Sequence, residues 1–449
     1  MFIILSAAQK YNSFLKEIKG KSEGYFLHET EKETERAILC GVHTGANSVL
    51  EDTTEETMAE LRELAQTAAA EVVGEMLQNK EHPEASTYFG EGKIEELREA
   101  CTALGATLLI FDDELTGSQI RNIEKITGVR TIDRSTLILD IFASRARSGE
   151  GKIQVELAQL KYNLPRLSGM GTQLSRLGGG IGTRGPGETK LETDRRHIHR
   201  RIHSLEEQLR EITERRKVLR ARREKENAYS AALVGYTNAG KSTILNYITG
   251  AEVFAKDMLF ATLDPTVRKL ELSDGRNAVL TDTVGFIRKL PHHLIEAFKS
   301  TLDEAISADV LVHVIDCADP DMEAHIAVVD KLLSELGCRA ARTVAVFNKC
   351  DIASPAISRP EGRYTDYVYV SAKTGEGMDK LLETLENALP GKKRRVTALI
   401  PYSDSRTAAQ LHDSEVILSE SYENDGIKIT LYADEKTYAA IKNYVIVQA

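Results

Sequence analysis

The chain has 449 residues, a length typical of about three domains. Its apolar content of 42% and charged content of 28% are ordinary for a globular protein, and no apolar run approaches the roughly 20 residues that a membrane helix needs. A net charge of -10 excludes a uniformly basic nucleic-acid coat, so any such surface must be local. Five scattered cysteines without a C-x-x-C pair favour a reducing, cytoplasmic location and argue against a metal cluster.

Residues 1–148 alternate strand-like and helix-like pieces, which predicts a small α/β domain with a parallel sheet. This part contains no phosphate-binding loop, and its charged residues are expected on solvated faces. The expected strands cover 36–42, 106–113 and 129–133, and the expected helices cover 54–73, 92–104 and 118–126.

Residues 149–227 carry two apolar stripes with heptad spacing, which predicts two helices that close on each other as an antiparallel coiled-coil arm. The mixed charges around the second stripe are expected on its solvated face. The first stripe is Ile153, Leu157, Leu160 and Leu164, and the second is Ile198, Ile202, Leu205, Leu209, Ile212 and Leu219.

The connection between these helices, 167–190, is rich in glycine and locally basic. It holds eight glycines and the cationic residues Arg176, Arg184 and Lys190, with no acid before Glu188. A pure linker would not need its leucines and arginines, and long loops without secondary structure are often functional. A cationic tip on a rigid arm can enter a phosphate-lined cavity and become ordered there. A passive loop is the alternative.

Residues 235–242 read GYTNAGKS, the G-x-x-x-x-G-K-[ST] pattern of a phosphate-binding loop. A strand-like run precedes it at 230–234 and a helix-like run follows at 243–248, as the motif requires. Its glycines permit backbone angles that a Cβ would block, its lysine neutralises β- and γ-phosphate oxygens, and its serine hydroxyl can bind Mg²⁺. The residues expected to bind nucleotide are Gly235, Tyr236, Thr237, Asn238, Ala239, Gly240, Lys241 and Ser242.

Two further motifs match the switches of a nucleotide hydrolase. In FATLDPT, a threonine can complete the Mg²⁺ shell when a γ-phosphate is present; Thr262 is the expected ligand, although Thr266 fits nearly as well. In DTVG, which follows the strand-like run 277–281, the aspartate can hold Mg²⁺ through water and the glycine N–H can contact the γ-phosphate. The expected nucleotide-binding residues are Phe260, Ala261, Thr262, Leu263, Asp264, Asp282, Thr283, Val284 and Gly285.

Two later motifs predict guanine as the base. NKCD follows a strand-like run, and its Asp351 carboxylate can accept hydrogen bonds from guanine N1–H and the exocyclic amine. Adenine lacks this donor pair, so such a site rejects it. SAK follows the next strand-like run, and the Ala372 N–H can bind guanine O6. The phosphate loop, DTVG, NKCD and SAK each follow a strand-like run, and together they predict a GTP site. The residues expected here are Asn348, Lys349, Cys350, Asp351, Ser371, Ala372 and Lys373.

The position after DTVG is Phe286, where many GTPases have a glutamine that orients water. Phenylalanine can neither orient water nor stabilise charge, so unaided hydrolysis is expected to be slow and the catalytic group is unknown. Asn238 is placed to help bind K⁺ against the phosphates, as an analogous asparagine does in cation-activated relatives. A partner that supplies the missing group is the other route.

Strands and helices alternate around these motifs over 228–392, and a basic run then leads into the tail, 393–449. The tail predicts a small α+β domain with a hairpin turn at 424–426. The expected fold class is therefore α/β: a P-loop GTPase domain with an N-terminal α/β domain, an antiparallel helical-hairpin arm and a small C-terminal α+β domain. The expected tail elements are strands at 396–402, 415–423 and 427–433 and helices at 405–413 and 435–444.

The sequence resembles the HflX family of ribosome-associated P-loop GTPases. The nucleotide motifs carry part of the resemblance, and the N-terminal half carries the more specific part: YFGEGKIEEL, IFDDELTGSQIRNIE, DRSTLILDIFASRA, VELAQLKYNLPRL and GGGIGTRGPGETKLETDRR. The resemblance implies binding to the large ribosomal subunit, with the N-terminal half near rRNA of the peptidyl-transferase centre. It also implies splitting or rescue of stalled ribosomes under stress. Phe286 fits the family pattern, whereas the tail is less diagnostic.

Two functions follow from these patterns. In the first, a GTP-switched monomer contacts rRNA through Arg176, Arg184 and Lys190, is stimulated by the ribosome and leaves after hydrolysis. In the second, a signalling GTPase docks a protein through its arm, without RNA. The NKCD motif disfavours an ATP-driven enzyme. Mg²⁺ is the expected cofactor and K⁺ a candidate second one, and contact with a membrane surface stays open.

Overall fold

The computed structural model describes most of the chain, in two compact units. The described residues are 34–43, 54–167, 186–225, 229–250, 259–260, 262–291, 294, 302–338, 342–353, 363–414 and 417–448. Most of the predicted tip, with Arg176 and Arg184, lies outside them, as does Ala261, and only the backbone of Lys190 is described. Unit 1 comprises Met1–Glu214, Lys256–Asp264 and Ile287–Ser300, and unit 2 comprises Arg215–Ala255, Pro265–Phe286 and Thr301–Ala449. The bounds of the four domains expected from the sequence stay a prediction.

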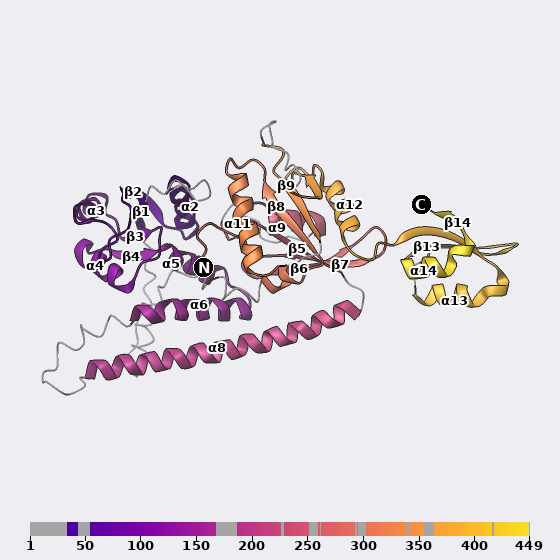
Figure 1. Cartoon of the computed structure of the whole chain (residues 1–449), viewed down its shortest axis with the longest axis horizontal. Coiled ribbons are helices and arrows are strands. Elements are labelled where there is room, and N and C mark those ends of the chain that lie inside the picture. Colours follow the sequence, from indigo (N-terminus) through magenta and orange to yellow (C-terminus); the bar gives the residue numbers. More distant parts are fainter. Residues whose placement is uncertain are drawn as a thin grey trace, which may run out of the picture. The chain divides into compact units, whose positions relative to one another are not determined.

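The N-terminal part of unit 1 is a parallel sheet covered by helices on both faces (Figure 1). Its elements are β1 Arg36–His43, α2 Thr54–Thr67, β2 Glu71–Asn79, α3 Glu91–Leu104, β3 Leu108–Phe111, α4 Gly117–Thr127, β4 Arg130–Asp133 and α5 Arg134–Arg145. The strand order is β2-β1-β3-β4, with every pairing parallel. Helices α2 and α5 pack on one face, and α3 and α4 on the other. Strands β1 and β3 are buried apolar runs, as expected for a sheet covered on both sides.

The predicted helix at 54–73 is wrong in its last six residues. Helix α2 ends at Thr67, and β2 begins at Glu71, after Ala69 with a φ of +63°. The alanine-rich run between them favours a helix, but the two β-branched valines that follow Glu71 favour a strand. Pairing with β1 along all of β2 decides the outcome. Local helix propensity therefore loses to a partner strand that is distant in sequence.

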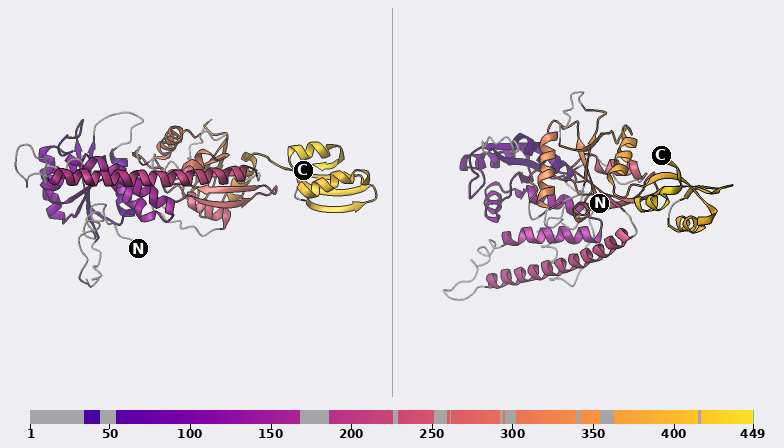
Figure 2. Two further views of the ribbon diagram at one scale, coloured as in Figure 1. Left: turned by 90° about the horizontal axis from the view of Figure 1, so that it is seen from below. Right: turned by 45° about the vertical axis from the view of Figure 1, so that its right-hand side comes forward.

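The arm consists of α6 Gly149–Leu167 and α8 Pro186–Lys225, which lie side by side in both views of Figure 2. Their apolar stripes pack as predicted, because Leu157, Ile202 and Leu205 are buried together with most other stripe residues around them. Arg201 forms a two-point ion pair with Glu156, at 2.7 and 2.8 Å, on the surface of this contact.

The predicted extension of the second stripe to Leu219 is wrong, because this side chain is 55% exposed. Helix α6 has 19 residues and α8 has 40, so the shorter helix cannot cover the whole of the longer one. Heptad spacing in α8 therefore continues beyond the part that packs in the arm.

Unit 2 contains a six-stranded sheet that carries the nucleotide motifs. Its elements are β5 Tyr229–Gly235, α9 Lys241–Thr249, β6 Thr266–Glu271, β7 Asn277–Asp282, β8 Val310–Asp316, α11 Met322–Glu335, β9 Arg342–Asn348, β10 Asp366–Tyr369 and α12 Met378–Ala388. The order is β10-β9-β8-β5-β7-β6, and β6 runs antiparallel to β7 while the other pairings are parallel. Helices α9 and α12 pack on one face and α11 on the other (Figure 1). The carboxyl ends of β5, β7, β9 and β10 therefore lie at one edge, where ligands of open α/β sheets bind.

The end of the chain is a small α+β fold, as predicted for the tail. Its elements are β11 Arg394–Ile400, α13 Ser405–Ser414, β12 Ile417–Glu423, β13 Gly426–Ala433, α14 Glu435–Ile441 and β14 Val445–Gln448. The antiparallel order β12-β13-β11-β14 gives the β-α-β-β-α-β arrangement of ferredoxin-like folds. The last strand was not expected from the sequence. Among the described residues, none of the helices combines the length and apolar character that a membrane span requires.

Candidate functional site

The predicted phosphate-binding loop lies between β5 and α9. Gly235 has a φ of 153°, and a Cβ there would lie 2.2 Å from the carbonyl oxygen of Val314 on β8. Gly240 has a φ of 96°, and a Cβ there would lie 2.2 Å from Nδ2 of Asn348. Both positions therefore need glycine for space as well as for backbone angle. Helix α9 starts directly after the loop, and the free N–H groups of its first turn favour an anion.

Lys241 is buried beneath this loop and bonded to its backbone. Its Nζ donates to the carbonyl oxygens of Gly235 at 3.1 Å and Tyr236 at 2.7 Å. Burial lowers the pKa of Lys241 to about 8, and the carboxylate of Asp282 offsets only part of that effect. A phosphate beside the ammonium would raise the pKa again. Nucleotide binding is therefore expected to take up a proton at alkaline pH.

Ser242 and Asp282 fit a Mg²⁺ site. Ser242 Oγ donates to Asp282 Oδ2 at 2.6 Å, and Asp282 is fully buried at the end of β7. A hydroxyl and a carboxylate are oxygen ligands of the kind that Mg²⁺ prefers. We expect Ser242 to bind the ion directly and Asp282 to hold one of its waters, and the bound ion would neutralise phosphate charge.

The two threonines considered as a further Mg²⁺ ligand differ in their surroundings. Thr266 is the first residue of β6 and is paired with Asp282 in the sheet, which fixes it in a strand. Thr262 precedes this strand, is partly exposed and belongs to unit 1. Thr262 is therefore the better candidate, and its place in the Mg²⁺ shell stays a prediction.

The backbone that follows β7 is tied to the phosphate loop. Phe286 N donates to Gly235 O at 3.1 Å, and Phe286 O accepts from Thr237 N at 2.8 Å. A Cβ on Gly285 would lie 2.8 Å from Thr237 Cγ2 and 3.1 Å from Lys241 Nζ, so only glycine fits against the loop. Phe286 is 2% exposed. Its ring is a packing group, in keeping with the expectation that it cannot orient water.

Asn348 connects the phosphate loop with both guanine motifs. Its Nδ2 donates to Ala239 O at 2.8 Å, and its Oδ1 accepts from Ala372 N at 3.0 Å. Its own carbonyl accepts from Cys317 N at 3.0 Å. The sequence assigned the Ala372 N–H to guanine O6, whereas in the structure this donor binds Asn348. The buried Asn348 side chain thus fixes three loops against one another.

The remaining residues of these motifs shape the loops around the base site. Asp351 is exposed, as a carboxylate that reads a base must be, and Lys373 is exposed as well. Lys349 has a φ of 66°, and its Nζ lies 2.6 Å from Asp316 Oδ2. Ser371 is fully buried, and its carbonyl oxygen closes a turn with a backbone N–H four residues on. These loops are therefore held by internal bonds, with Asp351 directed to solvent.

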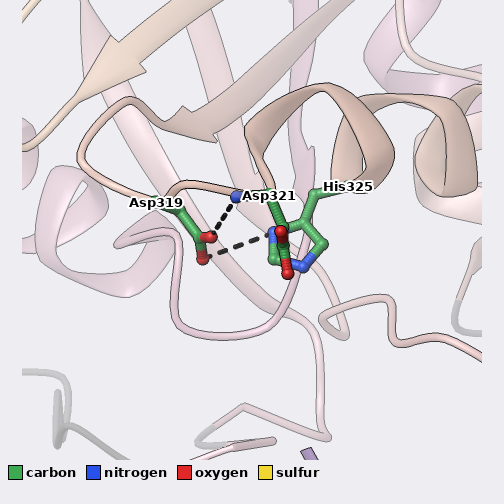
Figure 3. A group of neighbouring side chains, drawn as sticks. All are labelled: Asp319, Asp321 and His325. Carbon is green, nitrogen blue, oxygen red and sulfur yellow. Dashed lines mark hydrogen bonds and ion pairs between the residues drawn. The ribbon is translucent and has the colours of Figure 1, made fainter. Parts of the chain in front are cut away.

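Tyr236 of the phosphate loop is braced by α11, a contact that no sequence motif indicated. Its ring stacks on His325, with centroids 3.7 Å apart and planes 12° from parallel. Figure 3 shows the Asp319 carboxylate turned toward the Asp321 N–H and the His325 ring, at 2.8 Å and 3.5 Å. The potential ligand atoms of Asp319, Asp321 and His325 lie within 4.8 Å of one another. Because Asp319 is used to orient His325, we interpret this cluster as support for Tyr236.

The residues around Thr262 are anchored within unit 1. Phe260 and Leu263 are each 2% exposed, and the Phe260 ring meets the edge of Phe142 on α5 at a centroid distance of 4.7 Å. The carboxylate of Asp264 accepts two backbone N–H bonds at the start of α6. Their side chains therefore serve packing and capping, although the sequence grouped them with the nucleotide-binding residues.

A buried ionic network in unit 1 was missed by the sequence-based prediction. Arg134 is 2% exposed and donates to Asp112 Oδ1 at 2.8 Å and to the Arg288 carbonyl at 3.2 Å. Lys289 Nζ lies 2.6 Å from Asp112 Oδ2 and 2.9 Å from Asp113 Oδ1. Burial alone would raise the pKa of Asp112, but Arg134 and Lys289 outweigh it and lower that pKa. The network holds the residues that directly follow the DTVGF segment.

Three family models match successive parts of the chain. The model described as "GTP-binding GTPase N-terminal" matches residues 55–143, "GTP-binding GTPase Middle Region" matches 145–223, and "50S ribosome-binding GTPase" matches 230–349. The last range holds the phosphate loop, both switch motifs and the first residues of NKCD. The arm has a model of its own, in keeping with its distinctive sequence.

Known proteins match nearly the whole length. The chain is 50% identical to GTPase HflX of Caldanaerobacter subterraneus subsp. tengcongensis, over 94% of this chain and 96% of that protein. It is 42% identical to GTPase HflX of Escherichia coli K12, over 87% and 92% of the two chains. A GTP-binding protein of Sulfolobus solfataricus, solved in complex with GDP, is 23% identical with a TM-score of 0.43, over 79% and 98% of the two chains. Identities of 50% and 42% over most of each chain show that the chain belongs to the HflX family of GTPases and hydrolyses GTP.

Proposed function

We propose that this GTPase binds the large ribosomal subunit and splits or rescues stalled ribosomes under stress, as a cytoplasmic monomer that uses Mg²⁺. The match of 230–349 to a "50S ribosome-binding GTPase" model carries the proposal. The arm supports it, because the sequence that joins the two packed helices contains the glycines and the cationic residues Arg176 and Arg184. Such a charge distribution suits contact with rRNA phosphates.

GTP binding and hydrolysis would act as the switch. The backbone of Gly285 lies against Thr237 and Lys241, so a γ-phosphate at the loop must displace it or bond to it. Thr262 would bind Mg²⁺ at the same time, and hydrolysis would release both residues. The two states would then differ in Thr262 with its neighbours up to Asp264 and in the residues from Ile287 on, which belong to unit 1.

Hydrolysis is expected to be slow until a partner or an ion completes the site. Phe286 is buried and apolar, and it offers no group to orient water. Asn238 is exposed with a φ of 60°, a conformation that asparagine tolerates better than most residues. Its side chain can therefore face a K⁺ ion beside the phosphates. Equal turnover in K⁺ and Na⁺ buffers of the same ionic strength would rule out this role and leave the ribosome as the source.

The tip is tested by replacing Arg176 and Arg184 with alanine and measuring co-sedimentation with purified large subunits. Each lost phosphate contact weakens binding, so about tenfold or greater loss of affinity is expected, with GDP affinity unchanged. Arg200→Ala with Arg210→Ala is the matched control, because both are exposed on α8 and remove the same charge. Equal behaviour of the two double variants contradicts the role of the tip. Subunits that leave the GTPase rate unchanged would favour a signalling GTPase that docks a protein.

A further inference from the structure

Asp264 connects the FATLDPT motif, which contains the candidate Mg²⁺ ligand Thr262, to the first helix of the arm. Its Oδ2 accepts from the backbone N–H groups of Arg147 and Ser148, each at 2.8 Å, and its Oδ1 accepts from the Ser148 hydroxyl. These donors come directly before α6, which starts at Gly149. A carboxylate at the N-terminus of a helix is favoured both by the free N–H groups and by the helix dipole.

Helix α6 makes room for this carboxylate at Gly151. A Cβ at Gly151 would lie 2.2 Å from Asp264 Oδ1, an impossible contact, whereas a Cβ at Gly149 would meet nothing within 4 Å. Ser148 Oγ also accepts from the Gly151 N–H at 2.8 Å, which fixes the hydroxyl that binds Asp264. The glycine in the first turn of α6 is therefore a requirement of the Asp264 contact.

The same short segment is held a second time, on the other side of Thr262. Leu259 and Phe260 are buried, and the Phe260 ring packs on Phe142 of α5. Thr262 thus lies between two attachments made by its neighbours in sequence. Holding the ends of a short segment reduces the number of conformations that its middle can adopt.

We propose that Asp264 is a positioning residue for GTP hydrolysis, which presents Thr262 to the Mg²⁺ and γ-phosphate by fixing its segment to the start of α6. The proposal rests on the predicted role of Thr262 and does not require the ribosome. Because Asp264 preorganises the segment, GTP binding has less conformational entropy to overcome. GDP makes no γ-phosphate contact, so its binding should not depend on Asp264. A displacement of α6 would, by the same contact, change the hydrolysis rate.

Gly151→Ala tests this contact without altering either switch or phosphate loop. Alanine also suits a helix better than glycine, so folding should not suffer. We expect single-turnover GTP hydrolysis to fall about tenfold. The affinity for the imido analogue of GTP should fall relative to that for GDP, and GDP affinity itself should stay unchanged. Gly149→Ala, in the same turn of the same helix, should match the wild type in all three measurements.

A double-variant cycle separates positioning from general damage. Asp264→Ala should reproduce the Gly151→Ala defect, and the combination should be no worse than either, because both remove one interaction. Ser148→Ala removes one hydrogen-bond donor to Asp264 without adding bulk. It should therefore lower the hydrolysis rate and the affinity for the GTP analogue in the same direction, but by a smaller factor. Additive losses, unchanged or faster hydrolysis in Gly151→Ala, or an equal loss of GDP affinity would each overturn the proposal. Binding to large subunits is a separate measurement and can fail while this cycle holds.

Discussion

Removal of the Asn348 side chain would test how the structure builds its guanine site. Asn348→Ala deletes the bonds to Ala239 O at 2.8 Å and Ala372 N at 3.0 Å, and it leaves both backbone groups without their partner. Each lost hydrogen bond to a buried group costs about 1–1.5 kcal/mol. Two bonds therefore predict a loss of about 2–3 kcal/mol from the ordered loops. Because GDP must then order loops that Asn348 no longer holds, its binding should weaken by about this amount, roughly 30- to 150-fold.

The assay is a calorimetric titration with GDP and with xanthosine diphosphate. Asn348 holds the loops together but does not face the base, so Asn348→Ala should lower the affinity for both ligands by a similar factor. Titration at two temperatures checks that the variant is folded over the range used. GDP affinity within twofold of the wild type, or a changed ratio between the two ligands, would refute the assignment of Asn348 as a connector.

Asp351→Asn should weaken GDP binding at least about 100-fold and strengthen the binding of xanthosine diphosphate, because an amide can donate to the second xanthine carbonyl where a carboxylate cannot. An unchanged preference between the two ligands in the same titration would contradict recognition of the base by Asp351. Lys241 is charged below pH about 8 and neutral above it, and phosphate restores the charge. GDP binding should therefore take up about 0.7 proton at pH 8.5 and about 0.1 at pH 7. Calorimetry in buffers of different ionisation enthalpy measures this uptake, and equal uptake at the two pH values would contradict the lowered pKa of Lys241. Arg134→Met breaks a buried ion pair and should lower the free energy of unfolding by about 3–5 kcal/mol in urea, whereas Arg98→Met, half exposed, should change it by less than about 0.5 kcal/mol.

Much of the nucleotide site could be predicted because its chemistry is local in sequence. Gly235, Gly240 and Lys241 belong to one short motif, and the strand before it and the helix after it are visible in the flanking residues. The DTVG and guanine motifs also end strands, so parallel topology brings them to one edge of the sheet. The arm was predictable from its apolar spacing, except that spacing alone cannot say where the partner helix ends.

The rest depends on contacts between residues that are far apart in the chain. Asp264 lies in a motif that suggests a nucleotide contact, yet its carboxylate binds Ser148, 116 residues away. Arg134 sits at the start of an apolar helix, and nothing local indicates that it is buried against Asp112. Strand β2 likewise forms because it pairs with β1, although the alanine-rich residues just before β2 favour a helix. Sequence patterns report local preferences, whereas these features depend on tertiary pairing.

We propose that GTP controls binding to the large ribosomal subunit. Its most direct test is equilibrium binding of the intact protein to purified large subunits, measured with the imido analogue of GTP and with GDP at one salt concentration. We expect at least about tenfold tighter binding in the analogue state, since a nucleotide switch requires differential affinity of its two states. Equal affinity in both states, or no binding in either, would contradict it.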